Sequence, residues 1–210
     1  KVIQAGAKVL GNNKDGIDFS LEDDYYGDTR FHIPFIAWYQ VMNASLALTT
    51  MEVLKDRIPV TMEQLQAGIA NTRWQGRMET ILPGVIVDGA HNEDGVRRFV
   101  ETAERFQKEY PLTLLFSAVN DKDYQDMIHT ICSRIKFRKV VTTEVGGYRE
   151  VPSAELAEIF CKEGCKDVGN SDNIEEAFHM AHEAKGEDGM LFCVGSLYLV
   201  GEIKTLLLKK

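Results

Sequence analysis

Three short polar segments each follow an apolar run and contain residue types that bind phosphate or carboxylate groups. They are VDGAHN (87–92), SAVNDKD (117–123) and VGSLY (194–198). The turn before a helix offers free backbone N–H groups and the positive end of the helix dipole, which together bind anions. We therefore expect anion chemistry at these turns. The candidate residues are Asp88, His91, Lys122 and Ser196.

Each candidate also has a purely structural interpretation. Asp88 and Ser196 are residue types that cap helices, and His91 fits a loop histidine that faces solvent. Lys122 stands between two aspartates, as in a solvated charge cluster worth less than ~1 kcal/mol. The position of all three segments at one expected edge of a sheet favours a binding site. Upstream, Arg77 in RWQGRMET adds a planar donor fork suited to phosphate.

The elements that must position these residues alternate between strand and helix from residue 80 onward. Apolar runs typical of buried strands occur at 84–88, 112–119, 139–144 and 190–195, and amphipathic patterns follow them. This alternation predicts an α/β fold with a Rossmann-like, mostly parallel sheet and helices on both faces. In such open sheets, ligands bind outside the carboxyl ends of the strands.

The first third of the chain has a different pattern. Short strands are predicted at 7–11, 16–22 and 29–35, followed by a helix over 40–55 and a short helix that ends near Gly68. The punctuation around residues 70–76 predicts a domain junction. The expected domains are therefore 1–70 and 71–210.

Two helix starts have the spacing of a capping box. Thr61 is followed three residues later by Gln64, and Asp172 by Glu175. The sequence therefore predicts helices that begin at Thr61 and at Asp172.

The charge balance excludes nucleic acid as a general partner. The chain carries 24 Lys and Arg against 32 Asp and Glu, which gives a formal net charge of −8. Affinity for nucleic acid depends mainly on clustered Lys and Arg. A small anionic ligand needs only a few donors and is compatible with this composition.

Neither a membrane nor a zinc site is expected from the residues of this chain. No apolar run reaches the ~18 residues that span a bilayer, and the N-terminus lacks a signal pattern, so we expect a cytoplasmic protein. The cysteines lack CxxC spacing, which indicates reduced thiols. They are Cys132, Cys161, Cys165 and Cys193. The alternative of a zinc site made by Cys161, Cys165, His179 and His182 matches no common ligand spacing.

Several motifs in order resemble one enzyme superfamily over nearly the whole chain. WQGRME followed by VIVDGAHNEDGV resembles the start of the C-terminal domain of the Mur ligases, in the folylpolyglutamate synthase/dihydrofolate synthase branch. FSAVNDKDYQDMI and VGSLYLVGE are similar to that branch's DKD and GSLYL segments. WYQVMNASLAL occupies the place of the family's G-x-H-Q-x-x-N-A motif. Gln40, Asn43 and Ala44 match that motif, whereas Ala37 replaces its Gly and Tyr39 its His.

The resemblance implies an ATP-dependent amide ligase. In such enzymes a folate γ-carboxylate is activated as an acyl phosphate, which the amino group of glutamate then attacks. By matching motifs, Asn43 would face the adenine, Arg77 the phosphates, and Asp88 and His91 the ribose and phosphates. Lys122 and Ser196 would bind the carboxylates of the incoming glutamate. No residue of this chain is assigned a catalytic role.

One family feature is missing from the sequence. The family's phosphate loop, GxxxxGK[ST], does not occur, nor does the stretch that holds the Mg²⁺ ligands and most of the folate site. The chain therefore resembles a fragment, the end of the central ATPase domain plus the C-terminal domain, which is expected to be inactive alone. The implied partners of the full-length monomer are ATP, L-glutamate and a folate or dihydropteroate. The alternatives are another Mur-type ligase that builds peptidoglycan peptides and a non-catalytic α/β binding module.

Overall fold

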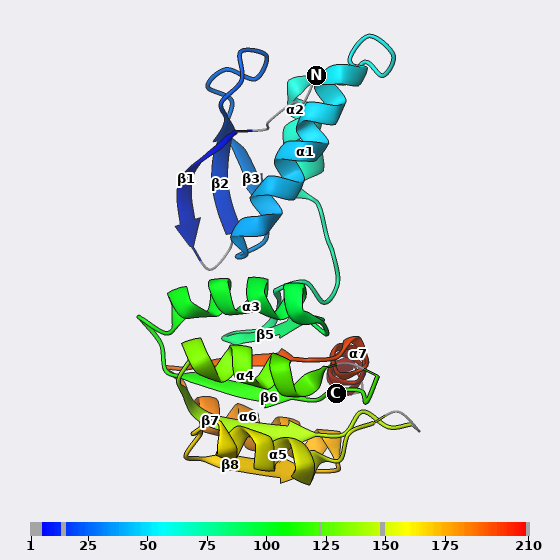
Figure 1. Ribbon diagram of the computed structural model, residues 1–210. Helices are drawn as coiled ribbons and strands as arrows, with labels where there is room; N and C mark the ends of the chain where they lie inside the picture. The colour runs from blue at the N-terminus through cyan, green and yellow to red at the C-terminus, as the bar shows by residue number, and fades with distance from the viewer. Residues whose placement is uncertain (1–5, 14–15, 122, 148–149, 209–210) are drawn as a thin grey trace. The chain divides into compact units, whose positions relative to one another are not determined.

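The computed structural model describes residues 6–13, 16–121, 123–147 and 150–208 (Figure 1). The chain divides into two compact units, Lys1–Trp74 and Gln75–Lys210. The division falls inside the junction expected at 70–76, a few residues after the predicted domain boundary. Each unit has its own sheet and its own apolar core.

The first unit is a three-stranded antiparallel sheet with two helices. Its elements are β1 (Ala7–Asn13), β2 (Gly16–Leu21), β3 (Phe31–Ile33), α1 (Trp38–Leu54) and α2 (Met62–Ala70). Ile17, Phe19 and Leu21 are buried at alternate positions of β2, as the period of a strand requires. The predicted capping box is confirmed, because the Gln64 N–H donates to Thr61 Oγ1 and the Thr61 N–H donates to Gln64 Oε1.

The second unit is a six-stranded sheet with five helices. Its strands are β4 (Glu79–Leu82), β5 (Val85–Asp88), β6 (Leu112–Phe116), β7 (Phe137–Thr143), β8 (Val168–Ser171) and β9 (Met190–Val194). Its helices are α3 (Glu93–Phe106), α4 (Tyr124–Arg134), α5 (Ser153–Lys162), α6 (Ile174–Lys185) and α7 (Leu197–Leu208). The strand order is β4-β5-β9-β6-β7-β8, and among these described strands β4 pairs antiparallel with its neighbour while the others pair in parallel. The predicted mostly parallel sheet is confirmed.

Helices cover both faces of this sheet (Figure 1). Alternate residues of β9 point to opposite faces. Phe192 packs against Phe99 of α3 with ring centroids 5.5 Å apart, whereas Cys193 belongs to an apolar cluster with Leu199 and Ile203 of α7. Both faces are therefore buried, which explains why the parallel strands are continuous apolar runs in the sequence.

The predicted helix start at Asp172 is wrong by one residue. The N-cap of α6 is Asn173, whose side chain accepts from the Glu176 N–H at 3.0 Å. Ser171, the last residue of β8, explains the shift. Its hydroxyl donates to the Glu176 carboxylate at 2.7 Å and accepts from the Asn173 N–H at 3.1 Å, so the capping spacing moves one residue along from Asp172 and Glu175.

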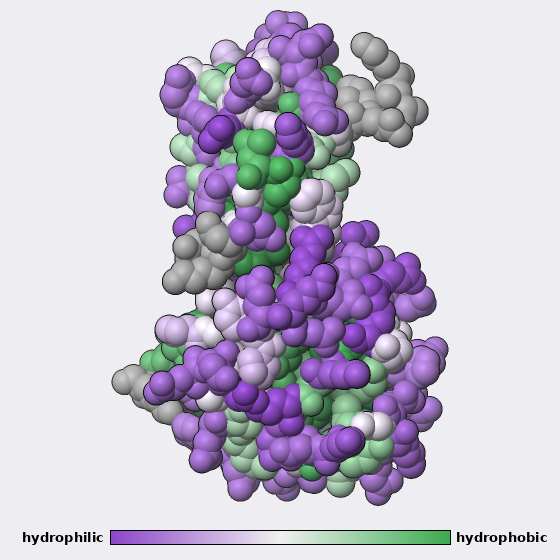
Figure 2. Space-filling model, turned by 90° about the vertical axis from the view of Figure 1, so that its left-hand side faces the viewer, coloured by the Kyte–Doolittle hydropathy of each residue, from purple (hydrophilic) through white to green (hydrophobic). Residues whose placement is uncertain are grey.

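The amino ends of the parallel strands of the second unit lie on the left in Figure 1 and face the viewer in Figure 2. The surface of the second unit on this side is mainly hydrophilic. Among the described residues, none of the helices combines the length and apolar character needed to cross a membrane.

Candidate functional site

At the carboxyl end of β9, the chain leads to a helix on one face of the sheet, whereas the neighbouring strands lead to helices on the other face. Asp88 of β5 and Phe116 of β6 both pair in register with Val194, the last residue of β9. The chain continues from β5 and β6 into α3 and α4, whereas it continues from β9 into α7 on the other face. Such a switch in direction opens a crevice outside the sheet, and ligands of open α/β sheets bind there.

Asp88 ends β5 at this switch in direction and is only 2% exposed. Its Oδ2 accepts from the Met78 N–H and its Oδ1 from the Ala90 N–H, both at 2.8 Å. Burial raises the pKa of Asp88 to about 6, although the two hydrogen bonds and the charges of Arg77 and His91 act in the opposite direction. Asp88 does not cap α3, because the N-cap of that helix is Asn92. The carboxylate instead ties the loop after β5 to the turn before β4.

The turn at residues 75–78 carries Arg77 and is held in place from several sides. The Gly89 N–H donates to Gly76 O at 2.7 Å, and Gly76 has a φ of +68° that favours glycine. Met78 adopts a φ of +45°, which is uncommon for a side chain without a polar group. This strained backbone directs the Met78 N–H at Asp88 and leaves Arg77 half-buried beside the same carboxylate.

Glu79 fastens the same turn to α7. Its Oε2 accepts from the Gly76 N–H at 2.7 Å, and its Oε1 lies 2.7 Å from Lys204 Nζ. The loop at Gly89 is also close to this helix, since a Cβ on Gly89 would lie 2.2 Å from Leu197 Cδ2. Segment 196–204 therefore converges with segments 76–79 and 88–91, which precede it by more than 100 residues, at the carboxyl edge of the sheet.

His91 is half-exposed beside Asp88. Its Nδ1 lies 2.7 Å from Gly89 O, and because a carbonyl oxygen only accepts, Nδ1 carries the hydrogen. This contact fixes the ring and leaves Nε2 as the nitrogen that can meet a ligand.

Ser196 lies between β9 and α7 and caps that helix. Its Oγ accepts from the Tyr198 N–H at 3.1 Å, and the side chain is buried. Ser117, which follows β6, is buried beside it, and the Ser117 N–H donates to Val194 O at 3.3 Å. The Ser117 Oγ has no hydrogen-bond partner within the part of the chain that the structure describes. An unsatisfied buried hydroxyl costs free energy unless a ligand or water meets it.

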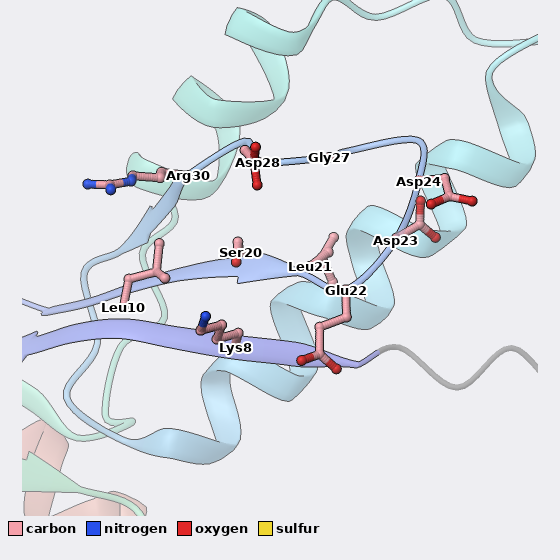
Figure 3. Close-up of a pocket in the computed structure, with 10 residues that line it drawn as sticks. All are labelled: Lys8, Leu10, Ser20, Leu21, Glu22, Asp23, Asp24, Gly27, Asp28 and Arg30. Carbon is pink, nitrogen blue, oxygen red and sulfur yellow. The ribbon is translucent and has the colours of Figure 1, made fainter.

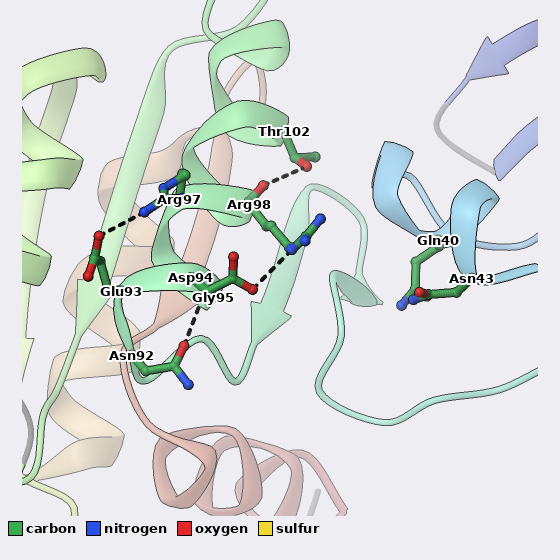
Figure 4. A network of polar contacts seen from close by, with 9 residues as sticks. All are labelled: Gln40, Asn43, Asn92, Glu93, Asp94, Gly95, Arg97, Arg98 and Thr102. Carbon is green, nitrogen blue, oxygen red and sulfur yellow. Dashed lines mark hydrogen bonds and ion pairs between the residues drawn. The ribbon is translucent and has the colours of Figure 1, made fainter. Parts of the chain in front are cut away.

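Two predicted site residues are not part of this cluster. Lys122 lies outside the described residues. Asn43 belongs to the first unit, where it is exposed on α1 and its Nδ2 donates to Gln40 Oε1 at 2.8 Å (Figure 4). The structure therefore brings together Arg77, Asp88, His91 and Ser196.

The N-terminal end of α3, which follows the loop after β5, is held by polar contacts (Figure 4). The Asn92 side chain accepts from the Gly95 N–H at 2.9 Å, and Arg97 and Arg98 pair with Glu93 and Asp94 one turn earlier. These contacts satisfy and charge-balance the first turns of the helix.

Sequence reasoning missed Met78, Glu79 and Ser117 as site residues. In the sequence, Met78 and Glu79 are only part of a linker, and no sequence signal predicts that Met78 has a positive φ. Ser117 was enclosed in the SAVNDKD segment, but its lack of a partner is a property of the packed structure.

A surface cavity of about 840 Å³ in the first unit was also not foreseen (Figure 3). Four carboxylates line it, from Glu22, Asp23, Asp24 and Asp28, together with Lys8 and Arg30 among its polar residues. This excess of negative charge does not suit a phosphate or a carboxylate ligand.

Within the residues that the structure describes, no three His, Cys, Asp or Glu side chains are grouped so that they could hold a metal ion. Cys161, Cys165, His179 and His182, the residues of the alternative zinc site, do not form such a group.

Comparisons with known proteins relate this chain to one family. A family model described as "Mur ligase, glutamate ligase domain" matches residues 76–197. A dihydrofolate synthase/folylpolyglutamate synthase of Bacillus subtilis is 30% identical over 194 residues, which cover 89% of this chain and 43% of that protein. The chain thus spans less than half the length of this curated relative.

Solved structures give the same result. A folylpolyglutamate synthase of Thermotoga maritima is 25% identical with a TM-score of 0.76, and the match covers 96% of this chain and 46% of that one. A folylpolyglutamate synthase of Mycobacterium tuberculosis, complexed with ADP and AMPPCP, has 24% identity and a TM-score of 0.75, over 95% of this chain and 47% of that one. The resemblance carried by the sequence motifs is confirmed.

Proposed function

This chain belongs to the Mur ligase family through its glutamate ligase domain, and from that premise we propose that it serves an enzyme that joins glutamate to a folate at the expense of ATP. The observation that carries the proposal is the match over residues 76–197, which includes the converging segments 76–79 and 88–91 and the start of the third, with Ser196. The activity belongs to a protein longer than this chain, because the relatives are more than twice its matched length.

The reaction has two steps. An oxygen of the folate carboxylate attacks the γ-phosphorus of ATP, which releases ADP and leaves an acyl phosphate. The amino group of glutamate then attacks the acyl carbon, the phosphate departs with that oxygen, and the amine loses a proton. Both steps depend on positioning the reactants and neutralising negative charge.

Arg77 supplies positive charge to the phosphates in this proposal. The turn that carries it is fixed by Asp88 through the Met78 N–H and by Glu79 through the Gly76 N–H. A guanidinium held in this way is pre-organised for phosphoryl oxygens. His91 presents Nε2 to the same phosphates or the ribose, while Asp88 acts through the loop that it ties together.

The glutamate carboxylates bind at the start of α7. Ser196 supplies the helix N-terminus, and Lys122, which lies outside the described residues, supplies a cation. The buried hydroxyl of Ser117, which has no partner among the residues that the structure describes, adds a donor that the sequence did not reveal. A carboxylate oxygen at this position would satisfy that hydroxyl.

The remaining parts of the proposal rest on the sequence resemblance. Asn43 faces the adenine, and the acceptor is a folate or a dihydropteroate. The described residues do not by themselves fit a Mg²⁺ site, so its ligands are sought in the longer protein and no step is routed through it. A monomeric state, a cytoplasmic location and the absence of nucleic-acid partners belong to the same set of expectations.

The acceptor decides between this function and peptidoglycan synthesis. The full-length protein that contains this chain is incubated with ATP, radiolabelled glutamate and either a reduced folate, dihydropteroate or a UDP-muramoyl peptide. We expect label in a folate or pteroate product and ADP in equal amount. Label transferred only to the UDP-muramoyl acceptor would identify another Mur-type ligase, and no transfer to any acceptor would favour a non-catalytic binding module.

A further inference from the structure

Two cysteine side chains meet at the edge of the second unit that lies opposite the site. The Sγ atoms of Cys132 and Cys165 are 3.6 Å apart, although the residues are 33 positions apart in the chain. Cys132 lies near the end of α4, which leads into β7, and Cys165 lies in the turn between α5 and β8. Both therefore lie near the amino ends of the parallel strands.

We propose that Cys132 and Cys165 are a redox modification site, at which a peroxide converts the two thiols into a reversible disulfide within one chain. The proposal is independent of the ligase activity, because it rests on the contact between the two sulfur atoms and on the packing around them.

The contact is held by hydrogen bonds on both sides. The Cys165 N–H donates to Phe160 O at 3.1 Å, which folds the turn back on the end of α5. His129 of α4 and Glu163, which ends α5, are joined by a 3.0 Å contact between Nδ1 and Oε2. The ends of the two helices are thus held together, and the two sulfur atoms must approach by about 1.5 Å from their 3.6 Å separation to form the bond.

The four cysteines differ in their access to an oxidant. Cys132 and Cys165 are half-buried, Cys161 is exposed, and Cys193 is fully buried in the sheet. The hydrogen-bond contact with the Cys132 side chain lowers the pKa of Cys165, whereas burial raises the pKa of Cys193. The thiolate is the nucleophilic form, so Cys165 is expected to react first and Cys193 not at all.

The chemistry is balanced with hydrogen peroxide as the oxidant. The Cys165 thiolate attacks one peroxide oxygen, the O–O bond breaks, and after protonation the products are a sulfenic acid and water. The Cys132 thiol then attacks the sulfur of the sulfenic acid, the S–O bond breaks and a second water leaves. Two thiols are oxidised by two electrons, and the peroxide is reduced to two waters.

The consequence is local to the amino edge of the sheet. The disulfide would tie α4 to the turn before β8, while the segments 76–79, 88–91 and 196–204 lie at the carboxyl edge. We therefore expect the cross-link to form in the folded chain without a change in the candidate site.

Peptide mapping tests the proposal on the full 210-residue chain. The chain is treated with hydrogen peroxide, remaining thiols are alkylated, and the protein is digested with trypsin without reduction. Cleavage after Lys and Arg places Cys132 in peptide 123–134, Cys161 in 150–162 and Cys165 in 163–166, so each thiol has its own peptide. We expect peptides 123–134 and 163–166 to be joined, in monomeric protein, and to separate on reduction with dithiothreitol.

Two variants make the assignment specific. Cys161→Ser removes the exposed neighbour and should leave the joined peptides unchanged, whereas Cys132→Ser should abolish them. A disulfide that involves peptide 150–162, a covalent dimer, or alkylated peptides 123–134 and 163–166 after peroxide treatment would each overturn the proposal.

Discussion

The carboxyl group of Asp88, at the end of β5, is buried at a position where its ionisation opposes folding. Asp88 accepts two backbone N–H groups, yet its pKa is raised to about 6 from an ordinary value of 3.8 because burial outweighs these bonds. A protein retains such a group when its position has another use. Here the position connects the turn that holds Arg77 to the loop that holds His91.

The pH dependence of stability should reveal Asp88. A carboxyl group whose pKa is higher in the folded than in the unfolded state binds more protons when folded. Its contribution to the free energy of unfolding therefore falls as pH rises from about 3 to about 7, by about 3 kcal/mol in total, and is level only above about pH 7. Asp88→Asn cannot titrate, so the stability of wild type relative to this variant should decrease over that range in urea denaturation. A difference that stays constant or increases would contradict the buried-carboxyl account.

Arg77 should matter for ATP more than its exposure suggests. In the full-length enzyme, Arg77→Ala is expected to lower kcat/KM for ATP by at least ~10²-fold, the loss found for one pre-organised charge-stabilising donor. Arg77→Lys should recover little, because a point charge does not replace the planar fork. Arg105→Ala, in the last turn of α3, is the matched control and should leave the kinetics unchanged. Kinetics close to wild type for Arg77→Ala, in a folded protein, would reduce Arg77 to a linker residue.

Ser117 and Ser196 separate ligand binding from helix capping. Ser196→Ala removes the acceptor for the Tyr198 N–H, so we expect a loss of ~1 kcal/mol in stability. We also expect the variant to raise KM for glutamate far more than KM for ATP. Ser117→Ala removes a hydroxyl without a partner among the described residues, so it should raise KM for glutamate without lowering stability. Thermal melts and glutamate titrations of the full-length variants measure both effects. An unchanged KM for glutamate in both variants would leave Ser196 as a cap only.

At the scale of elements, apolar periodicity predicted β5, β6, β7 and β9, because both faces of the sheet are covered there. It missed β4 and β8, which lie at the two edges of the sheet. Neither is a run of buried apolar residues, since β4 has no fully buried residue and β8 has only Ser171. It placed the start of α6 at Asp172 because Asp172 and Asn173 are both capping types, and the choice between them depends on Ser171. The positions of the four clustered site residues followed from strand ends, whereas their mutual contacts required the packed structure.

Gly195 tests whether the junction between β9 and α7 is as tight as the structure has it. It has a φ of +111°, and a Cβ there would lie 2.1 Å from Ser117 O and 2.7 Å from the Phe116 ring. We expect Gly195→Ala to cost ~3 kcal/mol or more of stability, since backbone strain and overpacking add. Gly201→Ala, on α7 with nothing near its Cβ, should instead stabilise by up to ~1 kcal/mol. Equal stability of the two variants in denaturant melts would show that the junction can relax.

At the scale of the whole molecule, the motifs that resemble the Mur ligases predicted the family to which the chain belongs. The second unit carries the family match, and the chain covers 43% of the Bacillus subtilis relative, so the sequence given holds only part of a ligase's machinery. Because the phosphate loop that holds the β- and γ-phosphates is not in this sequence, we expect the 210-residue chain alone to form no amide.

The central claim is that a folate carboxylate is activated by phosphorylation before glutamate attacks it, and the fate of the carboxylate oxygen tests this most directly. The full-length enzyme is given ATP, glutamate and an acceptor whose reacting carboxylate carries ¹⁸O, and the released phosphate is analysed by mass spectrometry. The account predicts one ¹⁸O atom in phosphate for each amide formed, because the phosphate leaves with the acceptor's oxygen. Amide formation with unlabelled phosphate would contradict it.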